Sequence, residues 1–296
     1  MTVLEVNNLT KYYGPLRALN NVSFKVPSGS IFGILGPNGS GKTTFLSLIM
    51  DILKPTSGNF SLLGSPNSNE IRKSIGTLLE TPNFYHYLSG EKNLKISAHI
   101  KGKGLNDIDR VLEVTGMAER RHSKFSSYSL GMKQRLAIAS CLLGDPDVLV
   151  FDEPTNGLDP EGIADIRSLI LQLRASGKTI IMASHLLDEV EKVCTHVAIL
   201  QKGHLLETGH VDEILVNEDI VEIQSDHAEF YTAAEAYEGK TGILKNGSFT
   251  QLIFPSGEAD LEKINSYFFK RGIVLKHLRL QKKSLETKFF ELTQKK

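Results

Sequence analysis

Apolar runs separated by polar turns fill the first fifth of the chain and predict β-strands. The run Ile31–Leu35 is almost wholly apolar, which is typical of a strand buried on both faces. It leads through a glycine-rich turn into an expected helix at Lys42–Met50. Alternation over 3–8 and an apolar run over 22–26 predict two earlier strands, separated by a turn at 13–15. The chain therefore opens with strands and a strand–turn–helix unit.

The apolar spacing changes in the middle of the chain. Between about 89 and 140 it is helical, which predicts a helical subdomain. The segments that follow alternate between strand and helix: Val148–Phe151, 163–175, 179–183, Leu186–Cys194 and Val197–Leu200. This alternation favours an α/β fold with a largely parallel sheet.

A second domain is expected after residue 212, where the candidate motifs end. The pattern predicts the order strand, helix, strand, strand, helix, strand, with a hairpin turn at Asn246–Gly247. This order suggests a small α+β domain of ferredoxin-like type at 213–296, behind a larger domain at 1–212. A short last helix is expected at Leu285–Leu292.

Composition excludes several classes of protein. The 296 residues are 41% hydrophobic and 23% charged, which rules out wholesale disorder. Lys+Arg and Asp+Glu both number 34, so the chain lacks the excess of basic residues that a dedicated nucleic-acid binder has. A basic excess at 270–296 is either a solvated face or a contact with acidic lipid headgroups.

The sequence also lacks the patterns of disulfide, zinc, secreted and membrane-spanning proteins. Cys141 and Cys194 form no CxxC pair, so a disulfide scaffold and a zinc module are excluded, and both are expected to be buried thiols in a reducing compartment. The N-terminal nine residues do not resemble a secretory signal. No apolar run approaches the ~20 residues that span a bilayer. We therefore expect a cytosolic protein that reaches a membrane only through a partner.

A phosphate-binding loop is the strongest chemical signal. The motif G-x-x-x-x-G-K-[ST] lies between a predicted strand and a predicted helix. Its residues, with the neighbouring Thr44, are candidate nucleotide ligands: Gly36, Pro37, Asn38, Gly39, Ser40, Gly41, Lys42, Thr43 and Thr44. Glycines let successive N–H groups point at phosphate oxygens. Lys42 would neutralise the β- and γ-phosphates, and the Thr43 hydroxyl would reach magnesium.

Two carboxylates end the apolar strand at Val148–Phe151. Asp152 would hold magnesium, directly or through water, and Glu153 would accept the proton of an attacking water. An apolar run that ends in Asp-Glu is common by itself. About 110 residues after a phosphate loop, it is the expected second half of a nucleotide site.

The order of these motifs resembles the nucleotide-binding subunit of an ABC transporter over residues 1–212. Tyr128–Arg135 looks like the family signature, 156–159 is similar to the D-loop, and His185 at a strand end matches the switch histidine. Tyr13 resembles the aromatic residue on which adenine stacks. The resemblance implies a P-loop NTPase core of ABC-ATPase type, with ATP and Mg²⁺ as its ligands.

The resemblance also assigns residues to a shared site. It implies that Ser129 and Gly131 contact the γ-phosphate of ATP bound to an opposite subunit. It implies that Asp159 lies at the interface of that homodimer and that His185 is catalytic. Three simpler interpretations stay open: Tyr13 as a core or turn residue, His185 as a structural hydrogen-bonder, and Asp159 as the cap of the next helix.

Two positions depart from the family pattern. The signature usually has the sequence Leu-Ser-Gly-Gly-Gln, but Leu130 stands where a glycine is usual. Glu80 stands in place of a glutamine that contacts magnesium and the permease, and it is either a magnesium or water contact or a solvated acid. Both departures, together with the tail at 284–293, resemble the bacitracin-resistance and lantibiotic self-protection exporters.

The resemblance implies a motor for a membrane export complex. Two copies would sandwich two ATP molecules, and hydrolysis would reopen the pair. A multispan permease would dock near 80–97 and hold the protein at the inner face of the cell membrane, and the cargo would be a peptide antibiotic, lantibiotic or related compound. Two alternatives are a soluble ATPase of the same superfamily acting on ribosomes or DNA, and a nucleotide-sensing regulatory subunit. No nucleic-acid partner is expected.

Overall fold

The computed structural model describes the chain except for residues 67–68, 80–82, 216–217, 256, 283–284 and 295–296. It divides into two compact units, Met1–Val211 and Asp212–Lys296.

The first unit begins with a four-stranded antiparallel sheet. Its strands follow the order β2 (Leu16–Pro27), β1 (Thr2–Tyr13), β4 (Ser57–Leu62) and β5 (Ser65–Pro66). Every second residue of β2 from Val22 to Val26 is buried, so this sheet turns one face toward the core. The strands expected at 3–8 and 22–26 are confirmed and are longer than the sequence indicated.

The second sheet carries the predicted parallel core. Its six strands follow the order β10 (His204–His210), β9 (His196–Gln201), β3 (Ile31–Leu35), β8 (Thr179–Ser184), β7 (Val148–Asp152) and β6 (Ile75–Leu78). All pairs are parallel except β9 with β10. Helix α1 (Lys42–Ile49) packs between the two sheets, and its buried Phe45 and Leu46 join one hydrophobic core with both.

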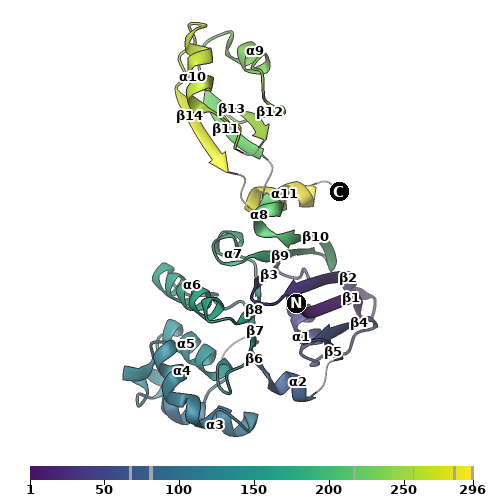
Figure 1. Cartoon of the computed structure of the whole chain (residues 1–296), viewed down its shortest axis with the longest axis vertical. Coiled ribbons are helices and arrows are strands. Elements are labelled where there is room, and N and C mark those ends of the chain that lie inside the picture. Colours follow the sequence, from purple (N-terminus) through teal and green to yellow (C-terminus); the bar gives the residue numbers. More distant parts are fainter. Residues whose placement is uncertain (67–68, 80–82, 216–217, 256, 283–284, 295–296) are drawn as a thin grey trace. The chain divides into compact units, whose positions relative to one another are not determined.

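Helices cover the parallel sheet and form the predicted subdomain. Figure 1 shows α3 (Gly90–Lys101), α4 (Ile108–Val114) and α5 (Leu130–Cys141) gathered at one end of the unit, away from the antiparallel sheet. The remaining helices of the unit are short or follow a parallel strand: α2 (Asn69–Lys73), α6 (Pro160–Ala175) and α7 (Leu187–Val193). Helix α8 (Val211–Leu215) begins at the division between the units.

Both cysteines are free and buried, as expected. A Cβ placed on Gly33 would lie 2.9 Å from the Cys194 Sγ. Because glycine has no side chain, α7 and the cysteine after it can pack closely on β3. A Cβ on Gly76 would lie 2.4 Å from the Cys141 carbonyl oxygen, which shows the same close approach of α5 to β6. Burial raises the pKa of the Cys141 thiol to about 12, and burial also raises the pKa of the Cys194 thiol.

The second unit has the predicted order of strands and helices. Its elements are β11 (Glu218–Gln224), α9 (Phe230–Glu235), β12 (Gly242–Asn246), β13 (Phe249–Pro255), α10 (Leu261–Phe269), β14 (His277–Lys282) and α11 (Leu285–Gln294). The sheet is antiparallel throughout with the order β12-β13-β11-β14, the arrangement of a ferredoxin-like domain. Val221, Leu252 and Phe268 lie in its buried core.

Some elements depart from the sequence predictions. The sequence Lys-Pro-Thr-Ser-Gly at 54–58 is typical of a turn, but β4 already begins at Ser57. The apolar run that begins at Ile273 is typical of a strand, but β14 begins only at His277, and Ile273 is buried in the core of the unit from the loop before the strand. Strands β4, β5, β6 and β10 and helix α2 had no counterpart in the predicted pattern.

Candidate functional site

The loop after β3 requires glycine at two positions, because a side chain at either one would clash with neighbouring backbone. A Cβ on Gly36 would lie 2.2 Å from the Leu200 carbonyl oxygen. Gly41 has a φ of +108°, and a Cβ there would lie 2.6 Å from the Ala18 carbonyl oxygen. The backbone therefore curls against its neighbours with no space left for a methyl group, as a phosphate cradle requires.

Helix α1 begins at this loop without a side-chain cap. Its first N–H groups are consequently available to an anion, and the helix dipole favours negative charge at the same place. The Ser40 hydroxyl oxygen is buried and has no hydrogen-bond partner among the described residues. A bound phosphate would supply acceptors for these groups.

Lys42 is held at the centre of the loop with its side chain 6% exposed. Its ammonium donates to the carbonyl oxygens of Gly36 at 2.8 Å and Pro37 at 3.3 Å. It also lies 3.5 Å from the Glu153 carboxylate. The cation is thus fixed among acceptors that a phosphate oxygen can replace.

Glu153 and His185 meet directly. Glu153 follows β7 with a φ of +49°, and its amide donates to the Ala183 carbonyl oxygen at 3.0 Å. Its Oε2 lies 2.8 Å from the His185 Nδ1. An ionised carboxylate only accepts, so the imidazole donates from Nδ1 and keeps Nε2 for another partner. The structure therefore joins three predicted residues, Lys42, Glu153 and His185, in one chain of contacts.

Asp152 and Thr43 offer oxygen atoms near this chain of contacts. Asp152 is 4% exposed at the end of β7, and Thr43 is exposed in the first turn of α1. A carboxylate and a hydroxyl are hard donors of the kind Mg²⁺ prefers. The described residues contain no group of three or more His, Cys, Asp or Glu side chains placed to hold a metal. The donor set fits a magnesium ion that takes its remaining ligands from phosphate oxygens and water.

A cavity of about 590 Å³ opens beside the loop. Predicted residues line it: Tyr13, Asn38, Gly39, Gly41, Lys42, Thr43, Thr44 and Glu153. Tyr13 is 43% exposed here, so its ring is available to a flat ligand. Pro37 belongs to the loop through its contact with Lys42.

Four residues of this cavity were missed by the sequence analysis: Leu16, Arg17, Ala18 and Lys202. Lys202 lies in the turn between β9 and β10, about 160 residues from the loop. The turn reaches the loop because the Gly203 amide donates to the Ser40 carbonyl oxygen at 3.0 Å. Arg17 and Lys202 bring two more cations to the cavity.

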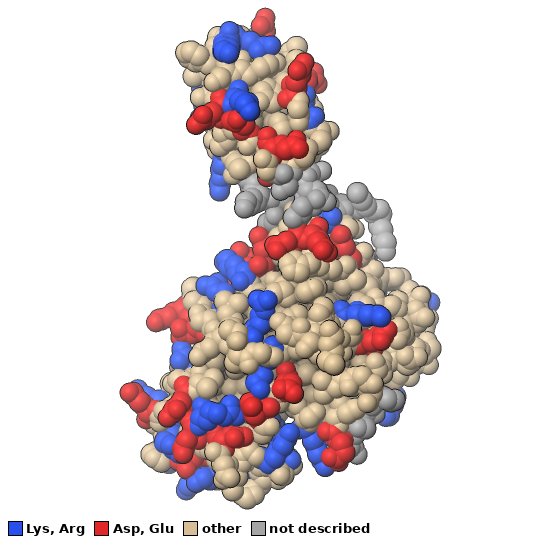
Figure 2. Space-filling model, viewed as in Figure 1, with Lys and Arg blue, Asp and Glu red and all other residues tan. Residues whose placement is uncertain are grey.

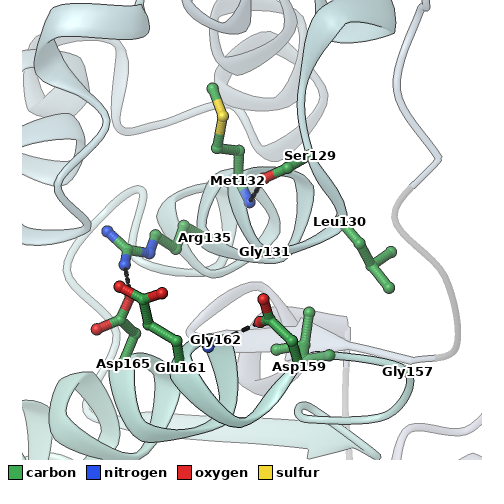
Figure 3. Close-up of a pocket in the computed structure, with 11 residues that line it drawn as sticks. Ser129, Leu130, Gly131, Met132, Arg135, Gly157, Asp159, Glu161, Gly162 and Asp165 are labelled. Atoms are coloured by element: carbon green, nitrogen blue, oxygen red, sulfur yellow. Dashed lines mark hydrogen bonds and ion pairs between the residues drawn. The ribbon is translucent and has the colours of Figure 1, made fainter.

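The signature residues lie in a different cavity of about 470 Å³ (Figure 3). Ser129, Gly131 and Asp159 line it, and none of them lines the cavity of the phosphate loop. Ser129 caps α5 by accepting from the Met132 amide at 3.3 Å, and Asp159 caps α6 by accepting from the Gly162 amide at 2.9 Å. The capping interpretation of Asp159 is confirmed. Glu80 lies outside the described residues.

A third cavity, of about 400 Å³, lies on the helical part of the unit. It is lined by residues of 83–86 and of α3, among them Asn93, Ser97 and Ile100. Ile100 is 82% exposed, Tyr85 of the same cavity is exposed, and the ring of the exposed Tyr87 lies 5.9 Å from that of Tyr85. This is a solvent-facing surface with several large apolar side chains close together.

The sequence and the fold are similar to those of known proteins. A family model described as ABC transporter matches residues 19–156. The chain is 37% identical to the bacitracin transport ATP-binding protein BcrA of Bacillus licheniformis over 98% of this chain and 97% of that protein. It is 36% identical to the lantibiotic transport ATP-binding protein SrtF of Streptococcus pyogenes over 69% of this chain and 89% of that protein.

Among solved structures, CbiO1 of Clostridium perfringens, part of the ABC transporter complex CbiONQ, is similar with a TM-score of 0.66 and 30% identity. The match covers 72% of this chain and 90% of that one. No helix within the described residues has the length and apolar character needed to cross a membrane.

Proposed function

The chain belongs to the ATP-binding subunits of ABC transporters, and we propose that it works as a homodimer that powers export of a peptide antibiotic, lantibiotic or related compound. The family couples ATP hydrolysis to transport.

The separation of Ser129 from the phosphate loop carries the homodimer proposal. The two segments line different cavities of one chain, and each cavity opens to solvent. Ser129 therefore needs a nucleotide from elsewhere if it is to contact a γ-phosphate. A two-fold pair that faces each loop with its partner's signature supplies two equivalent sites.

Catalysis follows from the contacts of one phosphate loop. ATP would stack its base on Tyr13 and place its phosphates against the N–H groups of the loop. Lys42 then exchanges its carbonyl acceptors for phosphate oxygens. Glu153, oriented by His185, accepts a proton from the attacking water. Thr43 and Asp152 would hold Mg²⁺, which neutralises charge on the phosphates.

A separate multispan permease would dock on the cavity between 83–86 and α3. The exposed Tyr85, Tyr87 and Ile100 offer the apolar contacts that an interface of this kind needs. Such docking would hold the protein at the inner face of the cell membrane. We propose that 213–296 is an accessory domain of this complex.

The cargo is proposed from the relatives. BcrA and SrtF are named for transport of bacitracin and of lantibiotics, and the match to BcrA extends over the second unit as well. Figure 2 shows Lys and Arg interspersed with Asp and Glu over the visible face of Met1–Val211, so no broad basic surface for nucleic acid is seen there. The contact of Glu153 with His185 favours turnover over a sensing role.

Affinity purification from native membranes tests the permease proposal. The tagged wild-type chain should retain a multispan membrane protein, whereas Tyr85→Asp with Ile100→Asp should lose it and keep soluble ATPase activity. Cells lacking the gene should become sensitive to bacitracin or a lantibiotic. A wild-type chain that brings down no membrane protein would contradict the proposal.

A further inference from the structure

Leu130 stands at the start of α5, between Ser129 and Gly131, with its side chain 49% exposed. In Figure 3 the side chain points away from Arg135 and toward the loop that carries Gly157. A Cβ on Gly131 would meet no atom beyond its chain neighbours and its own helix within 4 Å, so no distant segment covers this helix start.

The end of the Leu130 side chain lies close to the loop at Gly157. A Cβ on Gly157 would lie only 3.3 Å from the Leu130 Cδ2, and Gly157 has a φ of +76°. The leucine thus fits against a backbone position that has no side chain. The two residues also line the same cavity.

This loop is continuous with Glu153. The Asn156 amide donates to the Glu153 carbonyl oxygen at 3.1 Å, and the Leu158 amide donates to the Thr155 carbonyl oxygen at 3.3 Å. Asp159 then fixes the far end by capping α6. A short, hydrogen-bonded turn therefore connects the Leu130 contact to the proposed general base.

We propose that Leu130 is a positioning residue that couples the Ser129 segment to Glu153 of the same chain. The inference rests on the proposed function, in which Ser129 serves one nucleotide and Glu153 serves the other. Engagement of Ser129 by the partner's ATP would press Leu130 on the Gly157 turn and hold Glu153 in place. The leucine at this signature position would thereby link the two sites of the dimer.

The test compares Leu130→Gly with Leu130→Met. Leu130→Gly should lower kcat by about 2- to 30-fold, the range of ~0.5–2 kcal/mol couplings, and leave the nucleotide Kd of the isolated chain unchanged. Leu130→Met should keep most of the activity because it refills the contact. In a Glu153→Gln background, the Leu130→Gly chain should still dimerise with ATP, since Ser129 and Gly131 are intact.

A second variant examines the contact itself. Gly157→Ala should slow turnover, and adding Leu130→Ala should restore part of it by making room for the new methyl group. Equal kcat values for wild type and Leu130→Gly, or loss of ATP-driven dimerisation in Leu130→Gly, would overturn the inference. A wild-type chain without turnover would overturn the proposed function instead, and the inference with it.

Discussion

Replacing Glu153 by glutamine separates chemistry from binding, because the two should change in opposite directions. The amide keeps the shape of the side chain but is a poor proton acceptor. General-base catalysis contributes ~10²- to 10⁴-fold, so kcat should fall by that factor, or about 3–5 kcal/mol in activation free energy. The contact with His185 at 2.8 Å holds the Glu153 side chain in place.

ATP binding should tighten in the same variant. Lys42 lies 3.5 Å from the Glu153 carboxylate, an attraction of about 5 kcal/mol at an effective dielectric constant of ~20. That attraction competes with phosphate for the ammonium, and the 21% exposure of Glu153 lets water reduce it. We therefore expect an affinity gain of no more than about tenfold, or ~1.4 kcal/mol.

Steady-state hydrolysis, nucleotide titration and size exclusion with ATP measure these effects together. The variant should bind ATP, fail to turn it over and accumulate as a dimer. Glu70→Gln, at a solvent-exposed glutamate, is the matched control and should behave as wild type. Hydrolysis by Glu153→Gln within threefold of wild type would refute the assignment of Glu153 as the base.

Three further predictions rest on the structure, and a fourth, at Glu80, rests on the sequence. Lys42→Ala should weaken ATP binding by about 2–5 kcal/mol and so abolish it in ordinary titrations; normal affinity would contradict the phosphate loop. Gly41→Ala should destabilise the fold by about 2–5 kcal/mol, from its left-handed φ and the 2.6 Å approach to a carbonyl oxygen, and urea unfolding within ~1 kcal/mol of wild type would show this to be wrong. Lys54 holds the pKa of Asp51 below its ordinary value, so the carboxylate stabilises the fold above pH ~4 and that stability is lost as the pH falls. Asp51→Asn should therefore be less stable than wild type in urea at pH 7, and the difference should shrink as the pH falls below ~4; a constant difference would argue against the ion pair. Glu80→Gln should leave ATP binding intact and alter turnover or transport; an unchanged transport rate would make Glu80 a solvated acid.

The parts of the site formed by local sequence could be predicted. Lys42 and the glycines around it act within one strand–turn–helix unit, so their spacing specifies their geometry. Asp152 and Glu153 follow a strand whose apolar run is unbroken. The strand Ile31–Leu35 was predicted to the residue because its five positions are all buried.

Other features depend on contacts between distant segments. Strand β4 has mostly exposed or half-buried residues and is specified by pairing with β1, so no apolar pattern in the sequence predicts it. Lys202 reaches the nucleotide cavity only because Gly203 hydrogen-bonds to Ser40. The contact between Leu130 and Gly157 joins the start of α5 to the loop before α6. Neither residue predicts this contact from its own sequence surroundings.

The two buried thiols have a practical consequence for labelling and cross-linking this protein. Cys141 and Cys194 are inaccessible, and burial keeps both protonated at neutral pH, so thiol reagents should not modify the native protein. A cysteine introduced on the surface could then be labelled with a fluorophore or cross-linker without first removing the natural ones. Slow modification of the natural pair would, in turn, time the opening of the helices that cover the parallel sheet.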